Sequence, residues 1–598
     1  MTIREAPVLL AAAVVVIAAI LGGAFYPGPR IVVGVLLACS LGWAIVGLRG
    51  RPMAEEFLAI GFIVSGVVSA MAAATVPLAA REAITVWIVA GSLFFIARRI
   101  EVDTAQVALT VVTFGAIIVA LGVVCEALGL GGIRVGGLLE NPNIAASMLV
   151  VSLPILFVIE GGRRWLVSAG AVIVLGLVLT GSRAGLLALL VCAAFILPRG
   201  RFRGVALLAG GLGVTSILVW RFVDHPDVLA WFRPAIWAAV LRLWAEQPLL
   251  GVGPGGLVDA AGVERLLHTD HVGQRQFLIS YAESSPLALL VQTGVVGCII
   301  AASVAFVWWR GAHRSRGLSK PLVAALAAMA VMAAFHDLLT IDVVLWWWAL
   351  TVGLFEAEGR PPSAVAGFAT QGKIAGTVIG LVIAFTVLWG VVQPAWARWL
   401  WRSGAPDEAL AARSARAEPW FDAPLEWRVR DLVKRESWDW ITAAEAISQG
   451  ERAVGIHPGA ARLWSLLGMV HTRVVTDLGP WPDSIARARG AFARAVELEP
   501  LQPWAWLEWA RLERNLGHTS GAIDLVRKAL DAEPHTVRAR LFLARLELDR
   551  GNRDAAREAY SKATESARLR THSGLSSYER ELLGAPAWQF REIAQALK

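Results

Sequence analysis

The segment Gly181-Ser182-Arg183-Ala184-Gly185 carries residues whose types and spacing could bind a phosphate group. It lies between two apolar runs, and its small residues would let helix ends approach closely and leave backbone N–H groups accessible. Ser182 and Arg183 add hydrogen-bond donors, and arginine can grip phosphate oxygens in pairs. The alternative is that Arg183 only extends toward lipid headgroups.

A second polar segment precedes this one in the chain. Arg134 is followed by Asn141-Pro142-Asn143, which predicts a turn and then a helix capped by Asn143. Arg134 and the two asparagines could therefore bind substrate together with Ser182. The alternative is that the asparagines only begin the helix.

A third arginine lies in a stretch of different character. Around Arg233, apolar residues recur at helical spacing over 228–246, which predicts an amphipathic helix on or near the outer membrane surface. Pro248 to Gly256 follows as a breaker-rich turn that should bring backbone close to another group. No strand precedes these glycines, so they do not predict a nucleotide site.

Ionisable residues also stand where a later apolar run ends. His336 and Asp337 close the run and Asp342 follows. Ionisable groups at such a depth usually face an interior cavity. They could bind sugar hydroxyls, or they could mark only a short solvated loop.

Membrane helices must position these residues. Of the 598 residues, 56% are apolar and only 17% are charged, against about 25% in ordinary soluble domains. Apolar runs long enough to cross a membrane, some only with tilt, fill the chain up to residue 395. We count thirteen spans: 7–25, 31–48, 57–78, 83–97, 105–129, 144–159, 165–181, 185–198, 204–221, 285–309, 321–338, 342–357 and 374–394.

Basic residues set the expected orientation. Every second connection is short and carries at least two basic residues, which places the N-terminus in the cytoplasm. The connection 222–284 and everything after residue 395 then lie outside the cytoplasm. The short outer loops carry four single arginines that break this rule, at positions 30, 81, 134 and 183. The four cysteines lie in apolar runs without metal-ligand spacing, so we expect neither disulfides nor a metal site.

The tail, residues 396–598, is repetitive. Pro500 and Pro534 lie 34 residues apart, as do Gly517 and Gly551, and small residues fall at matching offsets. This period resembles the tetratricopeptide repeat. Pro458 is expected to end an earlier copy, with an insertion around residues 479–482. Such a domain could bind a protein partner or serve only as a spacer.

Together, four segments resemble the O-antigen ligase and polymerase superfamily over roughly residues 130–355. They are the Gly181–Gly185 segment, Arg134 with Asn141-Pro142-Asn143, Arg233 to Gly255, and Leu289 to Gly294. The resemblance implies an all-α polytopic bundle of the GT-C glycosyltransferase type. It also implies transfer of a glycan from a polyprenyl pyrophosphate to an acceptor hydroxyl, without a metal or other cofactor. Arg183 and Arg233, with Arg134, would hold the pyrophosphate.

The chain departs from that family at one position. Where the family has the histidine thought to act as base, counting back from Gly294 gives Glu283. A carboxylate can also take a proton from a hydroxyl. Alternatively activity is lost, His268 or His271 takes over, or Glu283 and Ser284 only cap the helix near Pro286.

We therefore expect a multi-pass bacterial inner-membrane enzyme, with an extracytoplasmic repeat domain that faces the periplasm in a diderm cell. Its substrates would be a lipid-linked glycan and a lipid or glycan acceptor, with no nucleic acid involved. A polymerase of the same superfamily is the nearest alternative. A flippase or assembly scaffold without catalytic activity is an alternative of another class.

Overall fold

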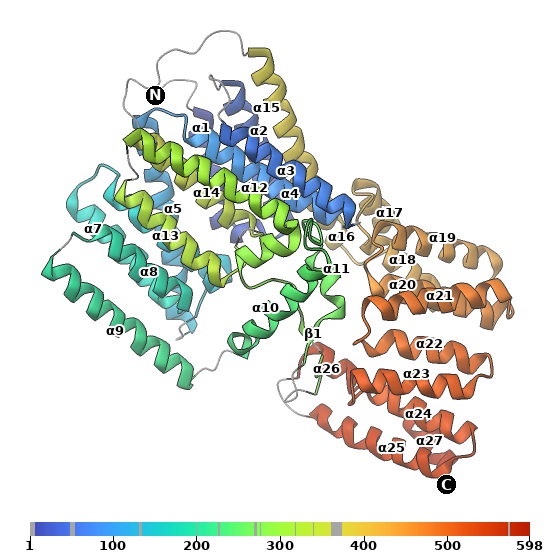
Figure 1. The fold of residues 1–598 in the computed structure, drawn as a ribbon. Helices are drawn as coiled ribbons and strands as arrows, with labels where there is room; N and C mark the ends of the chain where they lie inside the picture. Colours follow the sequence, from blue (N-terminus) through green and yellow to red (C-terminus); the bar gives the residue numbers. More distant parts are fainter. Residues whose placement is uncertain are drawn as a thin grey trace. The chain divides into compact units, whose positions relative to one another are not determined.

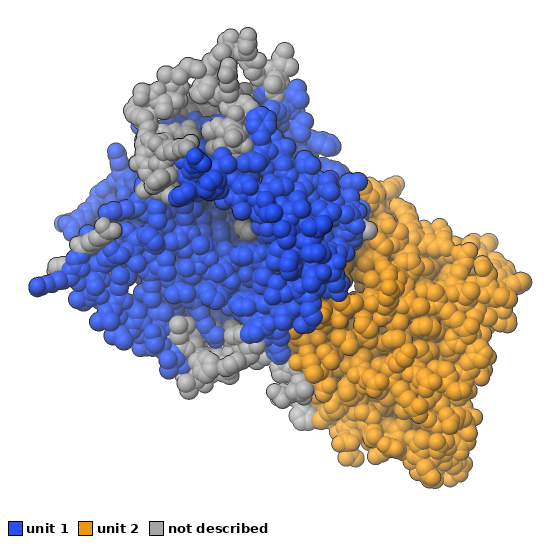
Figure 2. Space-filling model, in the orientation of Figure 1, with its two compact units in different colours: residues 1–255, 281–400 blue, residues 256–280, 401–598 orange. Residues whose placement is uncertain are grey.

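The chain folds into two compact units, and both are dominated by helices (Figure 1, Figure 2). Unit 1 comprises residues 1–255 and 281–400, and unit 2 comprises residues 256–280 and 401–598. The structure is a computed structural model. It describes residues 6–47, 54–73, 75–130, 134–198, 200–224, 228–267, 272–275, 277–316, 319–338, 340–359, 373–571 and 575–598.

Unit 1 is a bundle of apolar helices. Each of the thirteen predicted spans overlaps at least one helix, although 57–78 extends from α3 into α4, and the predicted helix over residues 228–246 is α10. The helices are α1 (Ala6–Ile20), α2 (Pro27–Gly47), α3 (Ala54–Ala72), α4 (Pro77–Ala97), α5 (Val102–Leu130), α6 (Pro142–Ser152), α7 (Arg163–Leu179), α8 (Arg183–Ile196), α9 (Arg201–Asp224), α10 (Val228–Glu246), α12 (Ser285–Arg316), α13 (Lys320–Phe335), α14 (Asp342–Glu358), α15 (Lys373–Val387) and α16 (Gln393–Arg402), with short 3-10 or π turns at Gly22–Ala24, Gly137–Leu139, Leu153–Phe157 and Leu388–Val392.

Several of these helices are long and apolar enough to cross a membrane. Within the described residues, five segments meet that standard: Pro27–Ile45, Pro77–Ala97, Val102–Gly129, Ser285–Arg310 and Gly376–Arg402. Five shorter apolar helices accompany them: Ala6–Ile20, Glu56–Ala72, Pro142–Phe157, Arg183–Ile196 and Lys320–Phe335. The shorter ones need tilt or packed neighbours to span the full hydrocarbon thickness.

The core of unit 1 lies around α14. Its Trp346 and Trp347 are fully buried, and the indole N–H of Trp347 donates to the Ser152 hydroxyl at 3.1 Å. The helix packs against α4, α5 and α6. A helix that is apolar on all sides is expected at the centre of a bundle rather than at its surface.

Ion pairs join helix ends that the alternating topology assigns to the same side. The Arg98 guanidinium at the end of α4 lies 2.6 Å from the carboxylate of Glu356 near the end of α14. At the other end of α4, Glu82 accepts two hydrogen bonds from Arg398, at 2.5 and 2.6 Å. These pairs hold both ends of α4 against neighbouring helices of unit 1.

Unit 2 contains the helical repeats. Its helices are α11 (Leu257–Ala260), α17 (Glu408–Ala417), α18 (Ala423–Lys434), α19 (Trp440–Ile456), α20 (Ala461–Arg473), α21 (Pro482–Leu498), α22 (Pro503–Asn515), α23 (Thr519–Ala532), α24 (Val537–Asp549), α25 (Arg553–Arg568), α26 (Ser577–Leu582) and α27 (Ala587–Leu597), with short 3-10 or π turns at Ala261–Val263, Val474–Leu478 and Leu569–Thr571. Two short strands, β1 (Arg265–Leu266) and β2 (Phe277–Leu278), pair antiparallel, with Arg265 opposite Leu278.

The predicted 34-residue period corresponds to helix pairs. Helix α22 packs against α23, and α24 packs against α25 (Figure 1). The small residues expected at helix crossings, Ala510 and Ala544, are fully buried, and Gly517 and Gly551 both have φ of +81°. The longer spacing before Pro500 is accommodated between α20 and α21, where a π-helical turn leads into Gly479.

Candidate functional site

Three of the predicted site residues meet in unit 1. One Nη of Arg233, on α10, lies 3.5 Å from a carboxylate oxygen of Glu283 and 3.5 Å from Nδ1 of His336. His336 Nδ1 is 4.0 Å from the same Glu283 oxygen. The side chains of Arg233 and Glu283 are 25% and 28% exposed, so solvent reaches the pair. We call these residues the Arg233 cluster.

Arg233 lies on the side of helix α10 that packs against the rest of unit 1. Ile236, Val240 and Leu243 are buried at the spacing of one helix face, and the helix packs against α12. Arg233 is one turn before Ile236 and therefore shares this face. The amphipathic character predicted from the sequence thus places the guanidinium toward the bundle.

The other members of the Arg233 cluster come from two loops that a serine joins. The buried Ser285 hydroxyl donates to the His336 carbonyl at 2.7 Å and accepts the Leu338 N–H at 2.9 Å. Glu283 stands two residues earlier, with φ of +51°, which is uncommon for a residue other than glycine. Ser285 therefore fixes the loop after α13 against the start of α12.

Asp337 lies beside the cluster and is only 6% exposed. Its Oδ1 atom has no hydrogen-bond partner among the described residues. Buried polar atoms in folded proteins are nearly always hydrogen-bonded, so this oxygen is an exception within the described part of the chain.

The glycine-rich turn after α10 docks into a break in α12. Gly294 interrupts that helix with φ of +63°, and the Val295 N–H donates to the Pro248 carbonyl at 2.9 Å. The Val252 N–H donates to the Val291 carbonyl at 2.8 Å. A Cβ at Gly294 would lie 2.2 Å from the Leu249 carbonyl oxygen, so only glycine fits. The predicted close backbone approach is therefore made to α12.

The remaining predicted residues form a second group. Ser182 caps α8 by accepting the Gly185 N–H at 3.2 Å, and its hydroxyl donates to the Asn143 side-chain oxygen at 2.8 Å. We call Ser182, Asn141 and Asn143 the asparagine cluster. Asn143 was predicted to cap α6, and this is wrong. Asn141 is the cap and accepts the Asn143 N–H at 2.9 Å, because Pro142 fits the first helical position.

Arg183 and Arg134 flank the asparagine cluster in sequence. Arg183 is the first residue of α8 and is half-buried. The Arg134 side chain is exposed, and its backbone has a positive φ. Its backbone N–H donates to the Leu179 carbonyl at 3.0 Å. Helix α13 links this second group with the Arg233 cluster, because it packs against α8 and is capped by His336.

The other two exceptional arginines have structural partners. The Arg30 guanidinium lies 2.7 Å from Asp342, and Arg81 is buried with its guanidinium 4.7 Å from the ring centre of Trp389. Cation–π contact and ion pairing account for charge at these positions. Asp342, grouped with His336 in the sequence prediction, therefore belongs to this separate network.

Two further predictions concern the alternative histidines and a metal site. His268 and His271 lie outside the described residues. Among the residues that the structure does describe, no group of three or more His, Cys, Asp or Glu is placed to hold a metal ion. The sequence did not predict the role of Ser285 in joining two loops or the break in α12 at Gly294. A serine or glycine in a sequence does not indicate which distant backbone group it will contact.

A bundle of apolar helices joined to helical repeats defines a polytopic membrane protein with a tetratricopeptide-like domain. Within that class, residues 168–302 match the O-antigen ligase family and residues 514–572 match the tetratricopeptide repeat. Residues 168–302 therefore form a segment similar to O-antigen ligases, as the motifs in that region predicted. The first match contains Arg183, Arg233 and Glu283.

Two of the solved structures that are similar to this chain illustrate the extent of the likeness. A thermophilic tetratricopeptide protein from Thermus thermophilus is 21% identical, over 34% of this chain and 97% of that one, with a TM-score of 0.26. MamA from Desulfovibrio magneticus is 17% identical, over 30% of this chain and 98% of that one, with a TM-score of 0.25. No functionally curated protein matches the chain.

Proposed function

We propose that the protein transfers a glycan from a polyprenyl pyrophosphate to an acceptor hydroxyl on the extracytoplasmic face of the membrane. The observation that carries this proposal is the Arg233 cluster, where a cation, a carboxylate and an imidazole converge within 4.0 Å. The similarity of residues 168–302 to the O-antigen ligase family supports the substrate class.

In the proposed reaction, the acceptor oxygen attacks the anomeric carbon with inversion. A C–O bond forms to the acceptor, the C–O bond to the pyrophosphate breaks, and its electron pair stays on the pyrophosphate oxygen. Arg233, with Arg183 and Arg134, stabilises the charge that develops there. Glu283 takes the proton that the acceptor hydroxyl loses.

The other polar residues would bind and orient. His336 contacts one Nη of the Arg233 guanidinium and would help to orient it, and Asp337 would accept a hydrogen bond from a sugar hydroxyl. The asparagine cluster contributes further groups near Arg183. The tetratricopeptide-like domain would bind protein, since repeats of this kind generally do.

The test uses the full-length protein in membranes with a defined lipid-linked donor. Glu283→Gln keeps the size of the side chain but cannot take the proton, so turnover should fall about 10²- to 10⁴-fold. Glu283→His should retain part of the activity. Glu246→Gln, an exposed glutamate at the end of α10, is the matched control and should transfer normally.

The outcomes separate the alternatives. Near-normal turnover in Glu283→Gln would refute the base and direct attention to His268 and His271. A ladder of lengthening products would indicate a polymerase, whereas a single transfer event indicates a ligase. Absence of transfer in the wild type, with donor and acceptor varied, would favour the scaffold or flippase.

A further inference from the structure

Part of the long loop between α10 and α12 belongs to unit 2. Residues 256–280 group with the repeats rather than with the helical bundle on either side of them in the chain (Figure 2). We call the described residues between Leu257 and Leu278 the docked segment. Its two ends continue into unit 1, toward Arg233 on one side and Glu283 on the other.

Three successive repeats hold the docked segment at equivalent positions. His457, Glu499 and Glu533 each stand at the C-terminal cap of a helix, and a proline follows each of them. We call these three residues the turn row. In chain order they contact Asp259, Arg265 and the backbone of Gln274 and Arg275. The docked segment therefore runs along the row in the same direction as the repeats.

The contact at Glu533 is the most buried. This fully buried carboxylate accepts the Arg275 N–H at 2.7 Å, the Gln274 N–H at 3.0 Å and the Tyr578 hydroxyl at 3.0 Å. Because two of these donors are backbone groups, Glu533 binds the backbone of the docked segment, and this contact does not depend on which side chains the segment carries. Such charge-assisted bonds are strong and directional.

An apolar contact adds to these bonds. Val272 packs against the cluster that contains Val537, Leu541 and Leu583. Next to it, the Gly273 N–H points to the Glu579 carboxylate at 3.4 Å. An apolar anchor beside satisfied backbone donors is the arrangement by which domains commonly bind extended peptides.

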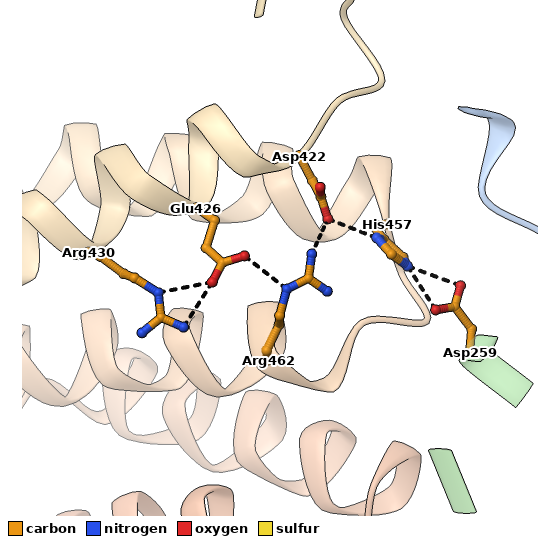
Figure 3. A network of polar contacts seen from close by, with 6 residues as sticks. All are labelled: Asp259, Asp422, Glu426, Arg430, His457 and Arg462. Atoms are coloured by element: carbon orange, nitrogen blue, oxygen red, sulfur yellow. Dashed lines mark hydrogen bonds and ion pairs between the residues drawn. The ribbon is translucent and has the colours of Figure 1, made fainter. Parts of the chain in front are cut away.

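The contact at the other end is an ionic network (Figure 3). His457 lies between Asp259 at 3.0 Å and Asp422 at 2.8 Å, and Arg462 also bonds to Asp422, at 2.5 Å. Burial alone would lower the pKa of His457, but hydrogen bonds to the two aspartates raise it to about 9. The imidazolium is therefore charged at neutral pH and joins the docked segment to α18 and α19.

Between these ends, Arg265 fixes the hairpin. Its guanidinium lies 2.7 Å from the Glu499 carboxylate and donates to the Arg275 carbonyl at 3.2 Å. Arg275 returns a bond to the Arg265 carbonyl at 3.1 Å. Hence the ionic contact with the turn row and the β1–β2 pairing depend on the same side chain.

We propose that the turn row is a receptor for this segment of the same chain, and that docking keeps the segment carrying Glu283 in place. Leu278 precedes Glu283 by five residues, so the end of the docked segment restricts where that carboxylate can lie. A loop held at several points has lost much of its conformational entropy before substrate binds. Only the consequence for transfer rests on the proposed function.

The experiment uses the full-length protein in detergent and follows hydrogen exchange in peptides spanning 257–267 and 277–285. Glu533→Gln removes the charge that accepts both backbone N–H groups, and Asp259→Asn weakens the His457 contact from the loop side without altering the repeats. Exchange in both peptides should become about tenfold faster or more, because charged hydrogen bonds are lost. Glu497→Gln, an exposed glutamate near Glu499, is the control and should exchange as the wild type does.

Transfer activity is measured on the same samples and should fall together with protection of peptide 277–285. Unchanged exchange in that peptide in both variants would overturn the proposal. Faster exchange with full transfer would also overturn it, while leaving the proposed glycan transfer intact. A wild type that shows protection but no transfer would refute the proposed function and leave docking to be judged by exchange alone.

Discussion

The Arg233 guanidinium lies 3.5 Å from the Glu283 carboxylate, although the loop between α10 and α12 separates the two residues in sequence. Without substrate, each side chain partly neutralises the other. A pyrophosphate would compete for the guanidinium and leave the carboxylate to accept a proton. Binding of the donor and activation of the acceptor would then be coupled through one ion pair.

The first prediction concerns the arginine fork. Arg233→Lys and Arg183→Lys keep the charge but lose the planar pair of donors, so transfer should fall about 10²- to 10³-fold if both arginines bind the leaving group. Arg242→Lys, on the exposed side of α10, serves as control. Transfer rates on equal amounts of membrane-inserted protein test this. Full activity in both variants would mean that the two arginines only contact headgroups.

The second prediction concerns Gly294. Gly294→Ala would place a Cβ 2.2 Å from the Leu249 carbonyl and strain a left-handed residue, so the turn after α10 should be displaced. We expect a lower thermal unfolding temperature and loss of transfer. Gly211→Ala on α9 is the control, because a Cβ there meets no atom within 4 Å. Equal melting of the two variants would contradict the close approach.

The third prediction concerns Ser285. Ser285→Ala leaves the His336 carbonyl and the Leu338 N–H without their shared hydroxyl, at a cost of about 1–3 kcal/mol. Since that hydroxyl positions His336, turnover should also fall, and Ser285→Thr should restore much of it. Calorimetry in detergent and transfer assays measure the two effects. Loss of stability without loss of turnover would mean that Ser285 stabilises the fold but does not position His336 for the reaction.

The fourth prediction concerns pH. The pKa of His457 is raised from 6.5 to about 9, so its contribution to stability is fully present below pH 6.5 and is lost as pH rises through about 9. The groups facing it are Asp259 and Asp422, with Arg462 bound to Asp422. The Tm difference between the wild type and Asp259→Asn should therefore shrink between about pH 6.5 and pH 10. A difference that stays constant would refute a charged His457.

The sequence by itself determined the local elements. Apolar runs of spanning length fixed the helices of unit 1, and the 34-residue period fixed α22 to α25, because hydrophobic burial and helix crossing require those patterns. It also marked Arg233 and His336 as polar groups in unusual places, whereas Glu283 was singled out only by the resemblance to the O-antigen ligase family. Each of these signals is carried by neighbours within a few residues or by a regular repeat.

Tertiary structure alone decided which of these elements meet. The pairing of Arg233 with Glu283 and His336, the insertion of the glycine-rich turn at Gly294, and the recognition of the Arg275 backbone by Glu533 join segments far apart in the chain. Backbone groups are the same for nearly every residue type, so no sequence pattern records such contacts. Only the packing of the helices determines which carboxylate reaches which N–H.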